Sequence, residues 1–383
     1  MGQTSPHPFL ISVERAEGIF IYSSDGKKYF DMISGIGVSN IGHRHPKVIQ
    51  AIKDQLDKHL HVMVYGEYVQ SSTNLLAKKL AQFLPAQLNC TYCVNSGTEA
   101  NEAALKLAKR ITGRTEIVSC KNSYHGSTHG SLSVSGNEIK KNAFRPLLPD
   151  IKFIEFNQEE DLPLITNKTA CVIMETVQGD AGVRMPSQKY LKAVRNRCDE
   201  TGAQLILDEI QCGMGRSGTL FAFEQFGITP DILTIGKAFG GGLPIAAFIS
   251  SKEKMQTLTH DPMLGHITTF GGNPVCCASA LATLQVIEEE KILDHVEAKG
   301  KLIETLLQHP NIKELRRIGL MFAIDFDSED RVTRIVKHCK ENGVIGYWFL
   351  SNPYSFRIAP PLTISEEEIR IACTIILRAI ENS

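Results

Sequence analysis

Short apolar runs alternate with stretches of helical periodicity through the middle of this chain. The short runs predict buried strands, and apolar positions that recur every three or four residues predict helices. The expected strands are 90–94, 116–119, 170–174, 204–207, 232–234 and 246–250, and the expected helices are 98–110 and 187–200. This alternation predicts an α/β fold with a largely parallel sheet that helices cover on both faces.

The C-terminal part carries a different pattern. Helices are expected at 278–290, 294–308, 329–342 and 366–380, and strands at 321–326 and 356–358. The N-terminus also contains strand-like pieces, at 19–22 and 28–31. We therefore expect residues 46–277 to form a large domain, and the N-terminal segment 1–45 to join a smaller α+β domain made by residues 278–383.

Charge and cysteine content narrow the class of protein. The 383 residues include 41 Lys+Arg and 42 Asp+Glu, which gives a net charge of −1. Binding to nucleic acid or to a membrane surface usually needs a basic excess, so neither partner is expected. The ten cysteines form no disulfide framework and the N-terminus carries no secretory signal, which together predict a cytoplasmic protein.

No metal site is expected from the sequence. Cys90-x-x-Cys93 lacks a second pair at metal-ligand spacing and lies in a strand-like run. The pairs His43-x-His45 and His59-x-His61 lack a carboxylate at a set spacing, which favours a surface or interface role.

Polar residues follow the expected strands at the sheet edge where ligands of parallel sheets bind. Ser96-Gly97-Thr98 opens a helix, and the free N–H groups of a helix start suit a phosphate group. The alternative is a simple N-cap made by Ser96 or Thr98. Farther along, Tyr124-His125-Gly126 could stack an aromatic ring on a planar ligand, or Tyr124 could be an ordinary loop residue.

Two ionisable residues end further strands. Asp208 directly follows an apolar run, where a buried carboxylate is costly unless a cationic ligand or an arginine such as Arg216 pairs with it. Lys237 lies between an apolar run and glycines 240–242, and desolvation there would lower its pKa and make its amine nucleophilic. A phosphate cradle, a stacking aromatic, an acid and an amine together suit pyridoxal phosphate (PLP).

The motifs resemble those of the class III aminotransferases, the ornithine, acetylornithine and 4-aminobutyrate type of PLP fold type I. They are 95–103 (NSGTEANEA), 124–126 (YHG), 175–179 (ETVQG), 208–211 (DEIQ), 236–238 (GKA), 268–274 (TTFGGNP) and 357–361 (RIAPP). The resemblance runs from about Gly18 to the C-terminus. It implies a large domain with a mostly parallel central sheet and a smaller α+β domain.

The resemblance also implies how a cofactor would be held. Lys237 would bind PLP covalently and later move a proton between the substrate carbon and the cofactor. Asp208 would keep the pyridine nitrogen protonated, and Gln211 would hydrogen-bond the phenolic oxygen. The other implied cofactor-binding residues are Ser96, Gly97, Thr98, Tyr124, His125, Glu175, Ile210 and Thr269. Thr269 would reach the phosphate of a neighbouring subunit, which implies an obligate homodimer with shared sites.

Three further residues are implied to contact substrate. Arg357 would bind the α-carboxylate of glutamate or 2-oxoglutarate, a bidentate task that suits a guanidinium. Ser127 stands where the family motif has an arginine that binds a donor carboxylate. Asp180 matches a family glutamate that neutralises the C-terminal arginine when no α-carboxylate is present, and it is one methylene shorter.

The expected activity is therefore the transfer of an amino group from an amine or amino acid donor to 2-oxoglutarate, by a ping-pong mechanism of the acetylornithine or ornithine type. The alternatives within the family are an ω-amine:pyruvate transaminase, an aminomutase or a decarboxylase, and a silent PLP-binding regulator lies outside these enzymes. Because Ser127 cannot replace a bidentate cation, N-acetylornithine and 4-aminobutyrate are expected to be poor donors unless Arg145 or Arg184 compensates.

Overall fold

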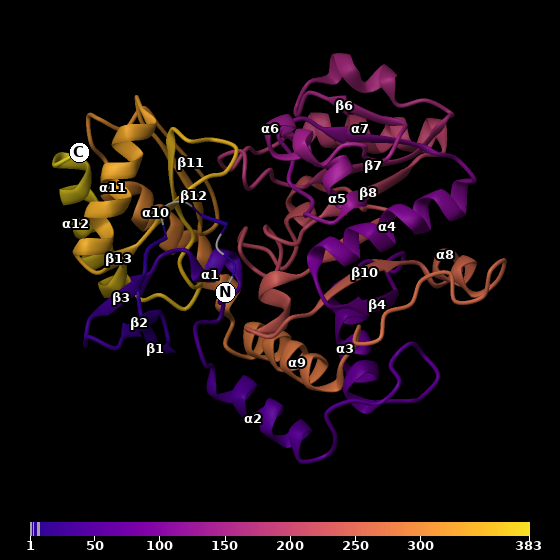
Figure 1. Cartoon of the computed structure of the whole chain (residues 1–383), viewed down its shortest axis with the longest axis horizontal. Coiled ribbons are helices and arrows are strands. Elements are labelled where there is room, and N and C mark those ends of the chain that lie inside the picture. The colour runs from indigo at the N-terminus through magenta and orange to yellow at the C-terminus, as the bar shows by residue number, and fades with distance from the viewer. Residues whose placement is uncertain (1, 3, 6–7) are drawn as a thin grey trace.

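The computed structural model describes residues 2, 4–5 and 8–383, and its ribbon divides into a larger and a smaller part (Figure 1). The larger part contains the strands β4 (Cys90–Val94), β5 (Glu116–Cys120), β6 (Ile151–Ile154), β7 (Thr169–Glu175), β8 (Gln204–Asp208), β9 (Ile232–Ile235) and β10 (Ala246–Ser250). They form one sheet in the order β4-β10-β9-β8-β7-β5-β6. The neighbours from β9 to β6 run parallel, whereas β10 is antiparallel to β9 and β4. The predicted α/β fold with a mostly parallel sheet is confirmed, and edge strand β6 is an addition to it.

Helices cover both faces of this sheet, chiefly α4 (Gly97–Thr112) and α7 (Gln188–Thr201). Neighbouring strand residues point to opposite faces and enter two separate apolar clusters. Val172 packs in the cluster that contains Val194 of α7, and Ile173 packs in the cluster that contains Ala104 of α4. Every residue of β7 and β9 is buried, which explains why their sequences are continuous apolar runs rather than alternating ones.

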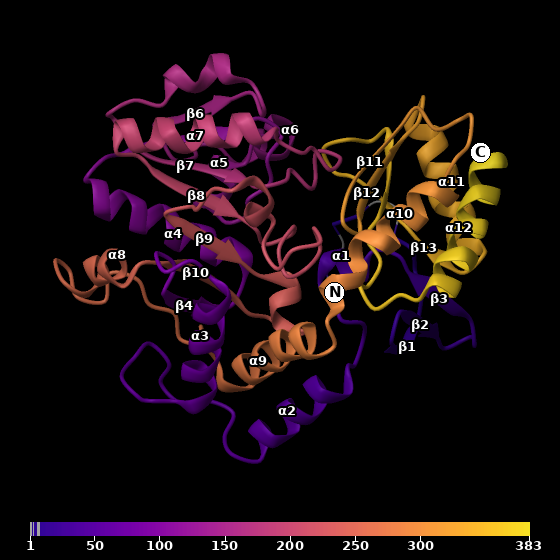
Figure 2. The same ribbon diagram turned by 180° about the vertical axis from the view of Figure 1, so that it is seen from behind.

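Helix α9 (Pro274–Glu289) packs against two helices that the periodicity did not predict, α2 (Pro46–Leu56) and α3 (Ser71–Phe83). It begins before the expected start at 278 because Asn273 caps it, accepting hydrogen bonds from the Val275 and Cys276 amides. The expected boundary between residues 277 and 278 therefore falls inside one continuous helix. These three helices lie together at the lower edge of the molecule in Figures 1 and 2.

The smaller part is built on two four-stranded sheets. One has the order β1-β2-β3-β13 and the other β11-β12-β15-β14. Their bounds are β1 (Val13–Glu17), β2 (Phe20–Ser23), β3 (Lys28–Asp31), β11 (Glu314–Ile318), β12 (Met321–Asp325), β13 (Val344–Ile345), β14 (Tyr347–Trp348) and β15 (Ser355–Ile358). N-terminal strand β3 pairs in parallel with β13, so the two ends of the chain share a sheet.

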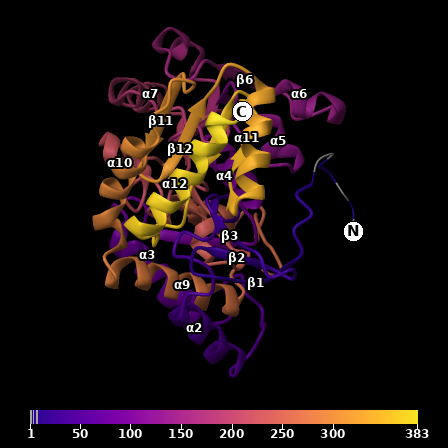
Figure 3. The same ribbon diagram turned by 90° about the vertical axis from the view of Figure 1, so that its left-hand side faces the viewer.

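Three helices accompany these sheets, α10 (Val296–Leu306), α11 (Glu329–Glu341) and α12 (Glu366–Glu381). In Figure 3, α11 and α12 lie in front, on the side away from the larger part. The short helices are α1 (Ser34–Gly37), α5 (His129–Val134), α6 (Glu138–Lys141) and α8 (Lys252–Gln256). No helix in the described part of the chain is long and apolar enough to cross a membrane.

Two histidines of the sequence motifs, His43 and His45, lie beside carboxylates. His43 lies 2.9 Å from Asp31 Oδ2, and His45 lies 3.1 Å from Glu290 Oε1. All ten cysteines are free, and the described residues contain no group of three or more His, Cys, Asp or Glu side chains that could hold a metal.

Candidate active site

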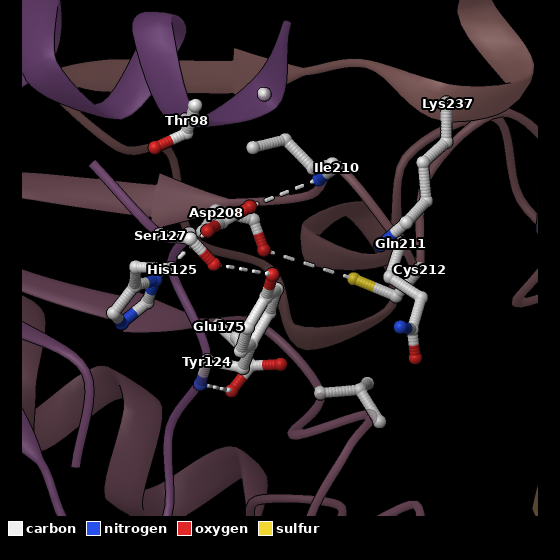
Figure 4. A pocket seen from close by; sticks show the side chains of 13 residues that line it. Thr98, Tyr124, His125, Ser127, Glu175, Asp208, Ile210, Gln211, Cys212 and Lys237 are labelled. Carbon is white, nitrogen blue, oxygen red and sulfur yellow. Dashed lines mark hydrogen bonds and ion pairs between the residues drawn. The ribbon is translucent and has the colours of Figure 1, made fainter. Parts of the chain in front are cut away.

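A cavity of about 260 Å³ lies at the carboxyl ends of the central parallel strands (Figure 4). Sheet register places Glu175, the last residue of β7, beside Asp208, the last residue of β8. Lys237 follows β9, the next strand in the sheet. The cavity is lined by Gly97, Thr98, Tyr124, His125, Gly126, Ser127, Glu175, Val177, Asp208, Ile210, Gln211, Cys212 and Lys237. The sheet thus brings together residues that lie far apart in the sequence.

Asp208 is buried and held by three hydrogen bonds. Its Oδ2 atom lies 2.8 Å from His125 Nδ1 and accepts a hydrogen bond of 2.8 Å from Asn101 Nδ2. Its Oδ1 atom accepts one of 3.0 Å from the Ile210 amide. The alternative partner, Arg216, instead donates to backbone carbonyls and to Asn40, so it does not neutralise Asp208.

Asn101 is a site residue that the sequence analysis did not single out. It is fully buried on α4, where most neighbouring positions on the inner face are alanine or leucine. Its side-chain nitrogen donates to Asp208 and to the His125 carbonyl, and its oxygen accepts from Thr234 Oγ1 at 2.9 Å. The signal that could have revealed it is a polar residue on an otherwise apolar helix face.

Lys237 has the left-handed backbone conformation, with a φ of 48°, which is uncommon for a residue other than glycine. Its side chain extends into the cavity (Figure 4), and no described residue forms a hydrogen bond or ion pair with its Nζ atom. Burial lowers the pKa of Lys237 below its usual 10.5, and the charge of Arg357 lowers it further, against the attraction of Asp208. Both effects make the amine easier to deprotonate than that of an exposed lysine.

The start of α4 distinguishes the two interpretations of Ser96-Gly97-Thr98, a phosphate site and a simple N-cap. Ser96 caps the helix, accepting a hydrogen bond from the Glu99 amide at 3.4 Å, and it does not line the cavity. Gly97 and Thr98 do line it. A Cβ atom at Gly97 would come within 2.8 Å of Ile210 Cδ1, so this close approach of the backbone needs a glycine.

Tyr124 lies half exposed on the opposite side of the cavity from this helix (Figure 4). Its backbone amide donates to Glu175 Oε2 at 3.2 Å, and its hydroxyl lies 3.4 Å from Ser127 Oγ. Burial and the nearby Asp208 charge raise the pKa of Glu175 well above its usual value. The buried Oε1 atom of Gln211 has no hydrogen-bond partner among the described residues, which leaves one polar group in the cavity wall available to a ligand.

Arg357, on β15, is 5% exposed and does not form the expected pair with Asp180. Its guanidinium has no hydrogen bond or ion pair in the described part of the chain, although its Cζ lies 5.2 Å from the ring centre of Phe349. Asp180 instead accepts hydrogen bonds from the Leu350 amide at 3.2 Å and from Ser351 Oγ at 3.1 Å. A buried, unpaired guanidinium is a strong receptor for an anion.

The remaining residues that sequence analysis considered lie away from this cavity. Thr269 is exposed and does not line it. Arg145 pairs with Glu138, and Arg184 donates to the Ala181 carbonyl at 3.4 Å. Neither arginine therefore compensates for Ser127 at the cavity wall.

Comparison with known proteins gives concordant matches over most of the chain. The family model described as Aminotransferase class-III matches residues 1–380. The chain is 43% identical over 371 residues to the acetylornithine aminotransferase of Methanocaldococcus jannaschii, covering 92% of this chain and 89% of that protein. These figures establish a relationship along nearly the whole sequence.

Two solved structures extend the comparison to the fold. The ornithine aminotransferase of Toxoplasma gondii matches with a TM-score of 0.91 and 30% identity, covering 98% of this chain and 90% of that one. An amine transaminase from an uncultivated Pseudomonas species, solved in a PLP-bound form, matches with a TM-score of 0.91 and 27% identity, covering 100% of this chain and 97% of that one. The resemblance drawn from the motifs is confirmed: the chain belongs to the class-III aminotransferase family and is an aminotransferase.

Proposed function

We propose that this aminotransferase uses PLP and transfers an amino group from an ω-amine donor to 2-oxoglutarate by a ping-pong mechanism. The observation that carries the proposal is one cavity lined by both the Lys237 amine and the Asp208 carboxylate. The positive charge of the unpaired Arg357 guanidinium lowers the pKa of Lys237, and this proximity supports a carboxylate receptor near the same amine. Membership of the family and the PLP-bound relative support the choice of cofactor.

The residues present fit PLP. Gly97 lies at the start of α4, where free amide groups and the helix dipole favour a phosphate, and its missing Cβ lets the Ile210 side chain pack against it. Gln211 presents a buried side-chain oxygen without a partner in the described structure. Asp208 offers a fixed negative charge that suits a protonated ring nitrogen. When bound, PLP supplies an electron sink that weakens the bonds around the amine-bearing carbon of the substrate.

The chain's own residues then orient the groups and move the proton. Lys237 would hold the cofactor through its amine. Once the substrate amine has displaced it, the freed Lys237 amine, whose pKa burial lowers, would accept a proton from the substrate carbon and return it. Asn101 and His125 hold the Asp208 carboxylate in one orientation, so its charge needs no rearrangement during the reaction. Arg357 binds the α-carboxylate of the acceptor with its two parallel N–H groups.

The donor would occupy a second cavity, of about 310 Å³, that shares Tyr124, Gly126 and Ser127 with the first. Its wall also contains Lys140 and Phe144. The name of the Methanocaldococcus relative supports a donor whose reacting amine is at the end of a chain, as in acetylornithine. Because Ser127 supplies no guanidinium here, we propose that donors lacking a distal carboxylate are used more efficiently than N-acetylornithine.

We also propose that two copies of the chain form a homodimer with shared sites. Apolar side chains are exposed on two segments, namely Leu60, Tyr68, Val69, Met263, Leu264, Ile267 and Phe270. Such a concentration of exposed apolar residues is typical of an interaction surface. Thr269 lies within the second segment, so a dimer formed there would bring it close to a neighbouring subunit.

A donor screen on the purified protein with PLP tests the activity. We expect glutamate to transfer its amino group to the enzyme, and a second amine to require 2-oxoglutarate for continued turnover. Pyruvate as the better acceptor would favour an ω-amine:pyruvate transaminase. Turnover without any keto acid, detected by mass spectrometry as a rearranged or decarboxylated product, would favour an aminomutase or decarboxylase and contradict the proposal.

A further inference from the structure

Asp180 lies near Arg357, the arginine proposed to bind the acceptor carboxylate. Asp180 is 5% exposed, and its charge is close enough to Arg357 to oppose the effect of burial on the arginine pKa. The two side chains nevertheless form no ion pair in the described structure, and both carboxylate oxygens of Asp180 accept hydrogen bonds from the segment after β14. The Leu350 amide and the Ser351 hydroxyl therefore occupy carboxylate oxygens that an ion pair with Arg357 would use.

The hydrogen bonds that hold Asp180 have a defined direction. Asn137 Oδ1 accepts from the Ile139 amide at 3.1 Å, so its Nδ2 group must be the donor to Ser351 Oγ at 3.0 Å. A serine hydroxyl has only one proton, and the oxygen is already used as an acceptor on this side. The Ser351 proton therefore points to Asp180 Oδ2, 3.1 Å away.

We propose that Asn137 and Ser351 form a latch that holds Asp180 away from Arg357 and so keeps the arginine open for a substrate carboxylate. This inference rests on the proposed function, in which Arg357 binds the carboxylate of the amino-group acceptor. Asn137 and Ser351 are positioning residues, since they act on the carboxylate site through Asp180. Both latch residues and Asp180 line the proposed donor cavity, so the donor and acceptor regions share one carboxylate.

Without the Ser351 hydroxyl, Asp180 Oδ2 loses its donor, while Asp180 Oδ1 still accepts a hydrogen bond from the Leu350 amide. A buried carboxylate oxygen that has lost its donor and a buried guanidinium that lacks a partner gain by pairing with each other. The pair would then compete with any incoming carboxylate. Removing the negative charge of Asp180 would abolish this competition, and that reversal distinguishes a latch from a merely structural contact.

The test compares wild type, Ser351→Ala, Ser351→Thr and the double variant Ser351→Ala/Asp180→Asn, each purified with PLP. Calorimetry measures the Kd for glutarate, which carries a carboxylate at each end and no reacting group, and steady-state kinetics measure the KM for 2-oxoglutarate. We expect Ser351→Ala to weaken glutarate binding about tenfold, as for the loss of ~1.4 kcal/mol. Ser351→Thr, which retains a hydroxyl, should bind as wild type does.

The double variant distinguishes a latch from a merely structural contact. If the latch exists, this variant should restore glutarate binding to within about twofold of wild type. Unchanged binding in Ser351→Ala, or weakened binding that Asp180→Asn fails to restore, would overturn the latch. So would the absence of glutarate binding in wild type. Glutarate binding does not require turnover, so an enzyme that binds glutarate through the latch but does not use 2-oxoglutarate would overturn only the proposed function.

Discussion

Replacing Asn101 with alanine removes the contacts that orient the acid of the site. The charge-assisted hydrogen bond to Asp208 Oδ2, 2.8 Å long, is of a kind worth about 1.5–3 kcal/mol. The bond to the His125 carbonyl adds about 0.5–1.5 kcal/mol, and the buried Thr234 hydroxyl loses its acceptor. Because these contributions overlap, we expect the free energy of unfolding to fall by about 2–4 kcal/mol.

The same substitution should reduce catalysis more than cofactor retention, since Asp208 would keep its charge but gain freedom to reorient. Urea unfolding measures the stability loss, and single-turnover reaction with glutamate measures the chemical step. Thr234→Ser is the matched control, because it keeps the hydroxyl that donates to Asn101. A stability loss below about 0.5 kcal/mol together with a wild-type glutamate rate would refute the assigned role of Asn101.

Three other substitutions test separate parts of the proposal. Lys237→Met should abolish turnover and the visible absorbance of lysine-bound PLP; normal activity would contradict the assignment of Lys237. In cofactor-free protein, the lowered pKa of Lys237 means that the unfolded state binds the lysine proton more tightly than the folded state does. The free energy of unfolding should therefore increase as the pH rises from that lowered pKa to about 10.5. Denaturation of Lys237→Met over the same pH range should not show this increase. Ser127→Arg should raise kcat/KM for N-acetylornithine by about tenfold or more in a steady-state assay, and no gain would refute the donor argument. Phe270→Glu should shift the protein toward monomer in analytical ultracentrifugation, and an unchanged dimer would exclude the apolar surface as its interface.

The local pattern of the sequence determined much of the larger part. Strands such as β7 and helices such as α4 could be predicted because periodicity is a local property, set by which faces of an element are buried. Lys237 and Asp208 could be singled out because an ionisable residue beside an apolar run has an energetic cost that a ligand can explain. The short strand β6 was not predicted, because it is half-buried at the sheet edge and carries a lysine.

The contacts between distant residues were decided only by the tertiary structure. Asn101 reaches Asp208 across 107 positions of sequence, and Asp180 binds Ser351 across 171. The family resemblance implied that Asp180 pairs with Arg357, and charge alone allowed Arg216 as a partner for Asp208. Which donor meets a carboxylate depends on how strands and loops pack in three dimensions. In both cases a neutral side chain, Asn101 or Ser351, donates to the carboxylate where the sequence had suggested an arginine.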